Sequence, residues 1–237
     1  TKDDVSFEVS GFASEVASEA IVPGRRLTSN ALRFRATPEE LTIFGPGQLD
    51  GVPLDADWRL QIGEDDAEDA PQASGRVIIT NEGLNALGVA LPDGFLSGQG
   101  EGRYQLFLAK GKSPRLTVSS DLRGLGLSIP ALDWTKTQEA PGGLELALSL
   151  GERPDVETLE LSAPGLALSG DVALTEEGTL REIRLNQLRV GNWLDASARL
   201  AAGGRSGTLA VSIDGGLLDL RSLPARSKAG GTDRRAG

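Results

Sequence analysis

The chain has 237 residues, of which 39% are hydrophobic, so it can bury a sizeable core in one large domain or two smaller ones. Its formal net charge of −10 argues against nucleic acid as a partner, because phosphate binding requires a basic surface. With no His and no Cys, it can form no disulfide and has no thiolate or histidine base. We therefore expect no catalytic residues, no metal site and no cofactor.

The two ends of the sequence carry their own signals. Met is absent, so Thr1 is not a native start, and we expect an excised or processed piece of a longer protein. Residues 225–237 mix cationic residues with Gly, Ala and Ser and show no apolar period, which predicts a disordered linker or tail. The folded unit is expected to span residues 1–224. No apolar run approaches the roughly 18 residues of a membrane span, so any anchor would lie outside this piece.

Alternating apolar and polar residues in the first 62 positions predict short strands. One begins near Val5, another carries Leu32 and Phe34, and residues 12–21 favour strand slightly over helix. The Gly-Pro-Gly sequence at 45–47 predicts the turn of a hairpin over 41–62. The acidic residues at 64–69 lack the spacing of a calcium loop and predict a solvated loop.

A single helix is expected over residues 81–91. Thr80 is a suitable N-cap, and Leu84, Leu87 and Leu91 lie on one helical face. Gly88 weakens the helix and Pro92 ends it. We expect this helix to lie against the apolar face or the end of a sheet.

From residue 97 onward the chain alternates between strand and turn signals. The short spacing predicts an antiparallel meander, because parallel crossovers need a dozen or more connecting residues. The expected strands are 102–109, 115–122, 125–129, 144–150, 157–162, 166–174, 179–190, 194–201, 207–213 and 216–220.

One face of these strands is rich in Leu and poor in aromatic residues. Its members are Tyr104, Leu106, Leu108, Leu144, Leu146, Leu148, Leu150, Leu159, Leu161, Leu166, Leu168, Leu209, Val211 and Ile213. Such a face can line a curled sheet or fill the closed core of a β-sandwich, and alternation alone does not separate the two. A carbohydrate-active β-protein would need converging carboxylates such as Asp55 and Asp57, whose positions on a polar strand face instead predict solvent-facing residues.

Several turn and strand-edge motifs of the chain resemble those of a known protein family. The chain resembles the AsmA-like family, especially its large YhdP/TamB-type members, over about residues 31 to 224. The motifs that carry this resemblance, in chain order, are residues 45–54 with Trp58, 91–98, 120–125, 130–136, 163–170, 190–194 and 215–221.

The resemblance implies an all-β segment whose antiparallel meander sheet is curled into an elongated groove. Family members are anchored in the inner membrane of Gram-negative bacteria, extend through the periplasm and conduct phospholipids towards the outer membrane. This chain would be a central segment that binds acyl chains, continues into flanking β segments of the same protein and touches membranes only through parts it lacks. The alternative is a structural β-sandwich module of a cell-envelope protein with a closed Leu core and no ligand.

Overall fold

The computed structural model describes residues 6–19, 24–62, 72–89, 91–108, 113–150, 155–174, 180–202, 209–219 and 221, with the backbone alone at 174, 180, 200–202 and 209–211. The predictions for Val5, for the acidic residues 64–69 and for the tail 225–237 lie outside these residues. In chain order, the strands begin with β1 (Val9–Ala13), β2 (Val16–Ser18), β3 (Leu27–Ser29), β4 (Leu32–Ala36), β5 (Glu40–Leu49), β6 (Val52–Gln61), β7 (Ala73–Thr80), β8 (Leu96–Phe107) and β9 (Arg115–Ser120). They are followed by β10 (Leu125–Ile129), β11 (Trp134–Lys136), β12 (Gly143–Ser149), β13 (Asp155–Ala163), β14 (Leu166–Leu174), β15 (Leu180–Val190), β16 (Leu194–Ala202) and β17 (Leu209–Leu218).

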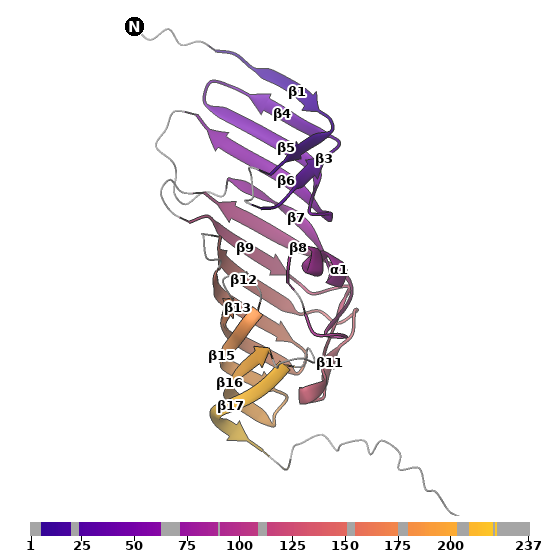
Figure 1. Cartoon of the computed structure of the whole chain (residues 1–237), viewed down its shortest axis with the longest axis vertical. Coiled ribbons are helices and arrows are strands. Elements are labelled where there is room, and N and C mark those ends of the chain that lie inside the picture. Colours follow the sequence, from indigo (N-terminus) through magenta and orange to yellow (C-terminus); the bar gives the residue numbers. More distant parts are fainter. Residues whose placement is uncertain are drawn as a thin grey trace, which may run out of the picture.

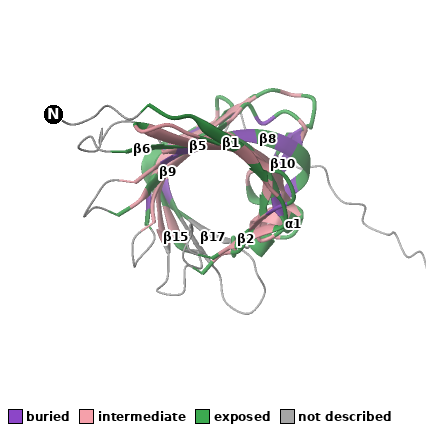
Figure 2. Ribbon diagram, turned by 90° about the horizontal axis from the view of Figure 1, so that it is seen from above, coloured by how far each residue is buried: buried purple, intermediate pink, exposed green. Residues whose placement is uncertain are grey.

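The described strands belong to one open, curled antiparallel sheet, as the alternation predicts. Its wall runs in the pairing order β1, β4, β5, β6, β7, β8, β9, β12, β13, β14, β15, β16 and β17. Neighbours in this wall are mostly neighbours in sequence, so the expected meander is confirmed. Figure 1 shows these strands stacked along the long axis, and Figure 2 shows them following the outline of a ring when seen down that axis. The described strands do not form the two facing sheets of a sandwich.

The hairpin of β5 and β6 is confirmed, but its predicted turn is wrong. Residues 45–47 lie inside β5, which runs on to Leu49. The chain reverses instead at Asp50 and Gly51, whose φ angles of 49° and 85° are those of a type I′ turn. This turn suits the twist of a two-residue hairpin, so the Asp-Gly pair prevails over the Gly-Pro-Gly sequence. The strand tolerates Pro46 because the pairing of β5 with β4 ends at Phe44 and its pairing with β3 begins at Gln48, so no ladder bond on that side requires the missing N–H. On the same side, the Ser29 hydroxyl donates a hydrogen bond to the Pro46 carbonyl at 2.6 Å.

The helix is shorter than predicted. α1 spans Asn81–Ala86, and the Thr80 side chain caps it by accepting a hydrogen bond from the Gly83 N–H, as expected. Its end is a Schellman motif: Val89 N–H donates to Leu84 O and Gly88 N–H to Asn85 O, with Gly88 at φ 76°. Gly88 therefore ends the helix before Leu91. Leu84 packs against the hydrophobic core, as expected, whereas Leu91 reaches the same core from the segment after the helix.

Three excursions from the wall lie along one long margin of the sheet. They are the β2–β3 hairpin, the segment holding α1, and residues 121–142, which we call the strap (Figure 1). The strap contains β10, a 3₁₀ turn at Pro130–Leu132 and β11; β10 pairs with the start of β8, and β11 pairs with β10. Arg25 lies between β2 and β3 and donates to the Leu87 carbonyl at 2.7 Å, which ties this hairpin to the segment holding α1. It also forms an ion pair at 3.0 Å with Asp50 in the β5–β6 turn.

Candidate functional site

The inner face of the curled sheet carries apolar residues in register from strand to strand. The longest of these alignments, which we call the distal row, lies farthest from the strap and places one residue of each wall strand in direct lateral pairing. Its members are Gly11, Phe34, Ile43, Trp58, Ala73, Leu106, Leu116, Leu148, Val156, Val172, Ile183, Leu200 and Val211. No charged residue interrupts it.

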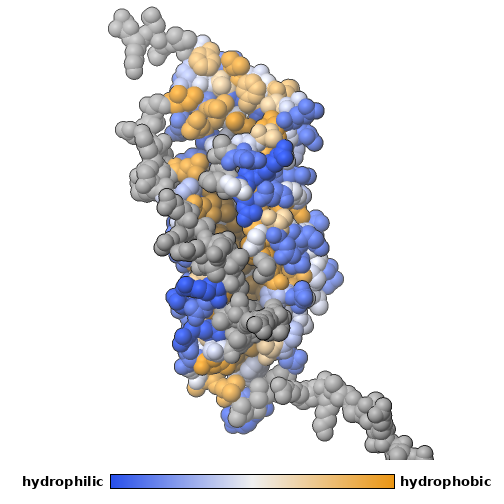
Figure 3. All heavy atoms as spheres, in the orientation of Figure 1, coloured by the Kyte–Doolittle hydropathy of each residue, from blue (hydrophilic) through white to orange (hydrophobic). Residues whose placement is uncertain are grey.

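Two further rows run beside the distal row, each nearer to the strap by two residues, or by three where a β-bulge inserts an extra residue. The middle row is Gly75, Tyr104, Val118, Leu146, Leu159, Gly170, Leu185, Ala198 and Ile213. The strap-side row is Ser120, Leu144, Leu161, Leu168, Leu188, Ala196 and Gly216. Because side chains alternate between the faces of a strand, all three rows share one face. Figure 3 shows patches of hydrophobic residues at several heights along the long axis, with hydrophilic residues beside and between them.

The strap buries only part of this face. Leu125 and Leu127 of β10 and Trp134 of β11 form one buried cluster with Leu185, Leu188 and other residues of β14, β15 and β16. Leu125 and Leu188 are each 1% exposed, which is the packing of a closed protein core. In the distal row, Ile183 packs against this cluster, whereas Trp58, Leu116 and Leu148 are half-buried and lie outside it. The apolar face therefore has a covered section and an open one.

Sequence reasoning missed the residue that fastens the strap. Lys136 of β11 is 4% exposed, and its ammonium group donates to the backbone carbonyls of Leu122 at 2.7 Å, Leu125 at 2.8 Å and Thr137 at 3.1 Å. These three acceptors match the three N–H donors of the group. Burial lowers the pKa of Lys136, because an ammonium loses hydration inside the protein. Its threonine neighbours in the sequence suggest an exposed strand, so no local signal reveals this burial.

Tyr104 is the aromatic polar residue of the middle row, and its hydroxyl is used within the protein. The ring lies beside Gly75 of β7, and the hydroxyl donates to the Asp55 carbonyl of β6 at 3.0 Å. The β6–β7 ladder has no pair at Asp55 and Ala56, although its register is the same on both sides of that gap. The Tyr104 hydroxyl therefore provides a hydrogen-bond donor for the Asp55 carbonyl, which the β6–β7 ladder leaves unpaired. Burial, with the charges of Asp55 and Asp57 adding to it, raises the pKa of Tyr104 to about 12.

The outer face is polar and held by exposed ion pairs. The two carboxylates considered for hydrolysis are here: Asp55 accepts from Arg76 at 3.0 Å, and Asp57 pairs with Arg59 at 3.3 Å. The hydrogen bond that Arg76 donates to Asp55 raises the pKa of Arg76. Each aspartate is thus engaged by an arginine on the convex surface, as the solvent-facing interpretation predicts.

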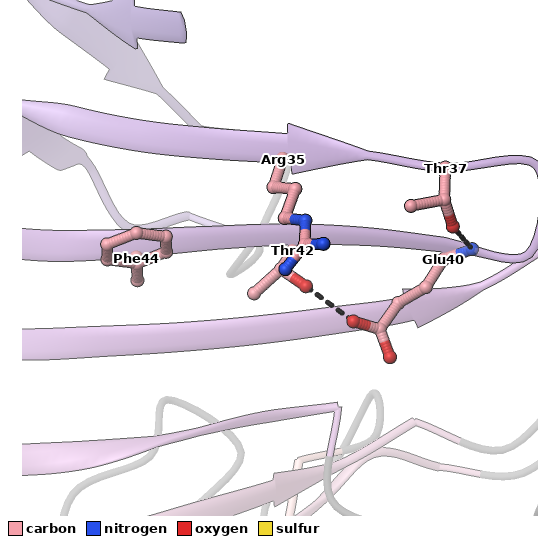
Figure 4. A pocket seen from close by; sticks show the side chains of 5 residues that line it. All are labelled: Arg35, Thr37, Glu40, Thr42 and Phe44. Carbon is pink, nitrogen blue, oxygen red and sulfur yellow. Dashed lines mark hydrogen bonds between the residues drawn. The ribbon is translucent and has the colours of Figure 1, made fainter. Parts of the chain in front are cut away.

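A shallow depression of about 410 Å³ also lies on the outer face, near the β4–β5 turn (Figure 4). It is lined by Arg35, Thr37, Glu40, Thr42 and Phe44. The Thr42 hydroxyl donates to the Glu40 carboxylate at 2.6 Å, and the Thr37 hydroxyl accepts from the Glu40 N–H at 3.1 Å. Local hydrogen bonds thus use several of its polar groups, and it is separated from the three apolar rows by the thickness of the sheet.

The predicted apolar residues are divided among several places in the fold. Leu106 and Leu148 lie in the distal row, with Tyr104, Leu146, Leu159 and Ile213 in the middle row. Leu144, Leu161, Leu166 and Leu168 belong to or pack against the core beneath the strap, with Leu166 4% exposed. Leu108 and Leu150 lie one residue beyond β8 and β12. Ile213 is 52% exposed, and the side chains of Leu209 and Val211 lie outside the described residues, although both pair with β16.

Comparison with known proteins identifies no relative: no family model, no curated protein and no solved structure matches the chain. The described helices include none that is both long and apolar enough to cross a membrane. In the described part of the chain, no group of three or more carboxylates is placed to hold a metal ion.

Proposed function

We propose that the chain is a segment of a periplasmic protein that conducts phospholipids between the inner and outer membranes, with acyl chains on the inner face of the curled sheet. The full-length protein would be anchored in the inner membrane of a Gram-negative bacterium, and flanking β segments would continue the groove. The observation that carries this proposal is the distal row, an apolar path in register from β1 to β17 without a charged residue.

The chemistry of the face favours hydrocarbon over peptide. A peptide carries backbone N–H and C=O groups that must find partners when they leave water. The paired strands already use their own backbone groups, and every described buried side-chain N or O atom has a hydrogen-bond partner. An acyl chain needs no such partner and gains about 0.8 kcal/mol for each buried CH₂ group. Because apolar residues recur from strand to strand, a chain could slide along the face with little change in free energy.

The resemblance of the turn and strand-edge motifs to the AsmA-like family supports the same proposal. It supplies the envelope location and the phospholipid substrate, which the apolar rows alone do not specify. Enzymatic activity is not part of the proposal.

A structural module without a ligand is the second candidate. The closed cluster beneath the strap favours it, because there the sheet buries its apolar residues against its own chain. The two candidates differ in the open section: a conduit takes up lipid there, and a structural module does not.

Native mass spectrometry with lipid extraction tests the proposal. The chain would be expressed in a Gram-negative periplasm and purified gently. We expect co-purified phospholipid, lost in the double variant Leu116→Asp and Val118→Asp, whose new carboxylates enter the inner face. The matched control, Thr117→Asp and Ser119→Asp, alters the other face of the same strand and should keep the lipid. A folded chain without lipid would refute the proposal and favour the structural module.

A further inference from the structure

The strap divides the apolar rows unequally. Leu188 and Ala196 of the strap-side row are 1% and 5% exposed and belong to the cluster beneath the strap. Leu116 and Leu148 of the distal row are half-buried and have no place in that cluster. Tyr104 and Val118 of the middle row are also half-buried. The accessible apolar surface of these residues therefore lies away from the strap.

The strap is attached at several points along its length. Its strand β10 pairs with β8 through Leu125, Gly126 and Leu127. Farther along, the indole N–H of Trp134 donates to the Pro164 carbonyl at 2.9 Å, which ties β11 to the β13–β14 turn. Moving the strap away would break these bonds and expose the cluster, so the strap is held in a fixed position against the sheet.

Glycines let the strap approach β8 closely. A Cβ at Gly100 would overlap the Leu125 side chain, and a Cβ at Gly98 or Gly124 would overlap the backbone of the facing segment. Gly98 and Gly124 also have φ angles of 80° and 79°. The short contact distance leaves no room for an acyl chain between the strap and β8.

We infer that a bound acyl chain lies along the distal row and along the middle row from Gly75 to Leu159, with the strap as a fixed side wall. The strap excludes the chain from the strap-side row and from Leu185 and Ala198 of the middle row, which are buried in the cluster beneath it. This inference rests on the proposed function and specifies the path within the same face. The path runs past Trp58, Leu116 and Leu148. The Tyr104 hydroxyl is engaged by Asp55, so the ring presents carbon atoms to the chain.

Protection of single cysteines from a maleimide tests the path. The chain has no Cys, so each introduced thiol is the only one present. Leu116→Cys places a thiol in the distal row, Thr117→Cys places one on the opposite face of β9, and Leu188→Cys places one beneath the strap. Labelling rates would be measured with and without vesicles of palmitoyl-oleoyl phosphatidylcholine, and lipid bound to the same samples would be quantified after extraction.

The path predicts that lipid slows labelling at Leu116→Cys about tenfold when the lipid concentration is about ten times the Kd, because only the unoccupied protein reacts. Thr117→Cys should label at the same rate with and without lipid, and Leu188→Cys should stay unreactive in both. Bound lipid without protection at Leu116→Cys would overturn the path and leave the proposed function standing. Equal protection at Leu116→Cys and Thr117→Cys would also overturn it. Absence of bound lipid would overturn both.

Discussion

The hydroxyl of Tyr104 reaches across strand β7 to donate a hydrogen bond to the backbone carbonyl of Asp55, at 3.0 Å. The contact is possible because residue 75, between them, is a glycine. It closes the gap that the β6–β7 ladder leaves at Asp55 and Ala56. One side chain thus completes the sheet's hydrogen bonding and keeps a polar group from facing the apolar rows.

Tyr104 should titrate well above the ordinary range of a tyrosine. Its pKa is raised from 10.0 to about 12, mainly by burial. Because it is the only tyrosine of the chain, ultraviolet absorbance of tyrosinate reports it alone. We expect the native absorbance to rise near pH 12, and that of the chain in denaturant near pH 10. A native midpoint near pH 10 would contradict the buried position.

The same shift makes stability depend on pH in one window. Below pH 10 the tyrosine is protonated in both states, and its contribution is fully present. Between about pH 10 and 12 the unfolded chain loses the proton while the folded chain keeps it, so the free energy of unfolding falls. Two pKa units correspond to at most about 2.7 kcal/mol, and the half-exposed position reduces this to about 1 kcal/mol. Urea unfolding of the chain and of Tyr104→Phe should converge as the pH rises through this window.

Gly75→Ala should be strongly destabilising. The added methyl group would overlap the Asp55 carbonyl and crowd the Tyr104 ring, so backbone has to move. Overpacking of this kind costs about 1–3 kcal/mol, which urea unfolding measures. Gly215→Ala is the matched control, because a Cβ there meets no atom within 4 Å and should change the free energy of unfolding by less than about 0.5 kcal/mol. Equal effects of the two substitutions would show that Gly75 is not a point of close approach.

The apolar face was predictable because strand alternation is a local property. Successive residues of a strand point in opposite directions, so one face of β12 holds Leu144, Leu146 and Leu148. The register across strands also follows, since a one-residue shift would turn the leucines outward. The hairpin turn was harder to place, because Gly-Pro-Gly and Asp-Gly are both turn signals and the choice between them depends on the twist of the paired strands.

The division of the face was not predictable from the sequence. Leu168 and Leu148 belong to the same alternating pattern, yet the first packs against the core beneath the strap and the second lies outside it. Only the path of residues 121–142 across the sheet distinguishes them. The same holds for Lys136, whose acceptors include the carbonyl of Leu122 in the turn before β10 and that of Leu125, the first residue of β10. Such contacts between segments carry no local signature.

Trp58 should report occupancy of the groove by lipid. It lies half-buried in the distal row, whereas Trp134 is 7% exposed in the core and Trp193 packs against that core. Phosphatidylcholine brominated on its acyl chains should therefore quench up to about one third of the emission, since the chain has three tryptophans. Trp58→Phe should abolish this quenching. Quenching that persists in the variant would place the lipid elsewhere.

Asp50 should make the fold sensitive to acid. Its pKa is lowered by a hydrogen bond from the Arg26 N–H and then by the Arg25 side chain. A carboxyl with a lowered folded pKa stabilises the protein above its ordinary value of 3.8 and loses that contribution as the pH falls through the folded pKa. Asp50→Asn keeps the turn, because Asn tolerates positive φ, and removes the titration. Acid should destabilise the parent chain more than this variant, as seen by circular dichroism between pH 5 and about pH 2; parallel curves would contradict the role of Asp50.

Lys136→Met should release the strap. Methionine nearly fills the volume of the lysine stem but leaves the carbonyls of Leu122, Leu125 and Thr137 without their donor. Because buried unsatisfied carbonyls each cost about 1–3 kcal/mol, we expect a loss of about 3 kcal/mol or more in urea unfolding. Trp134 lies on the same strand, so its fluorescence should shift to longer wavelength, and hydrogen exchange should quicken in residues 121–142 before the rest of the sheet. Thr135→Met, at an exposed neighbouring position, is the control and should leave all three measurements nearly unchanged. If Lys136→Met behaved like that control, the ammonium group would not be what holds the strap against the sheet.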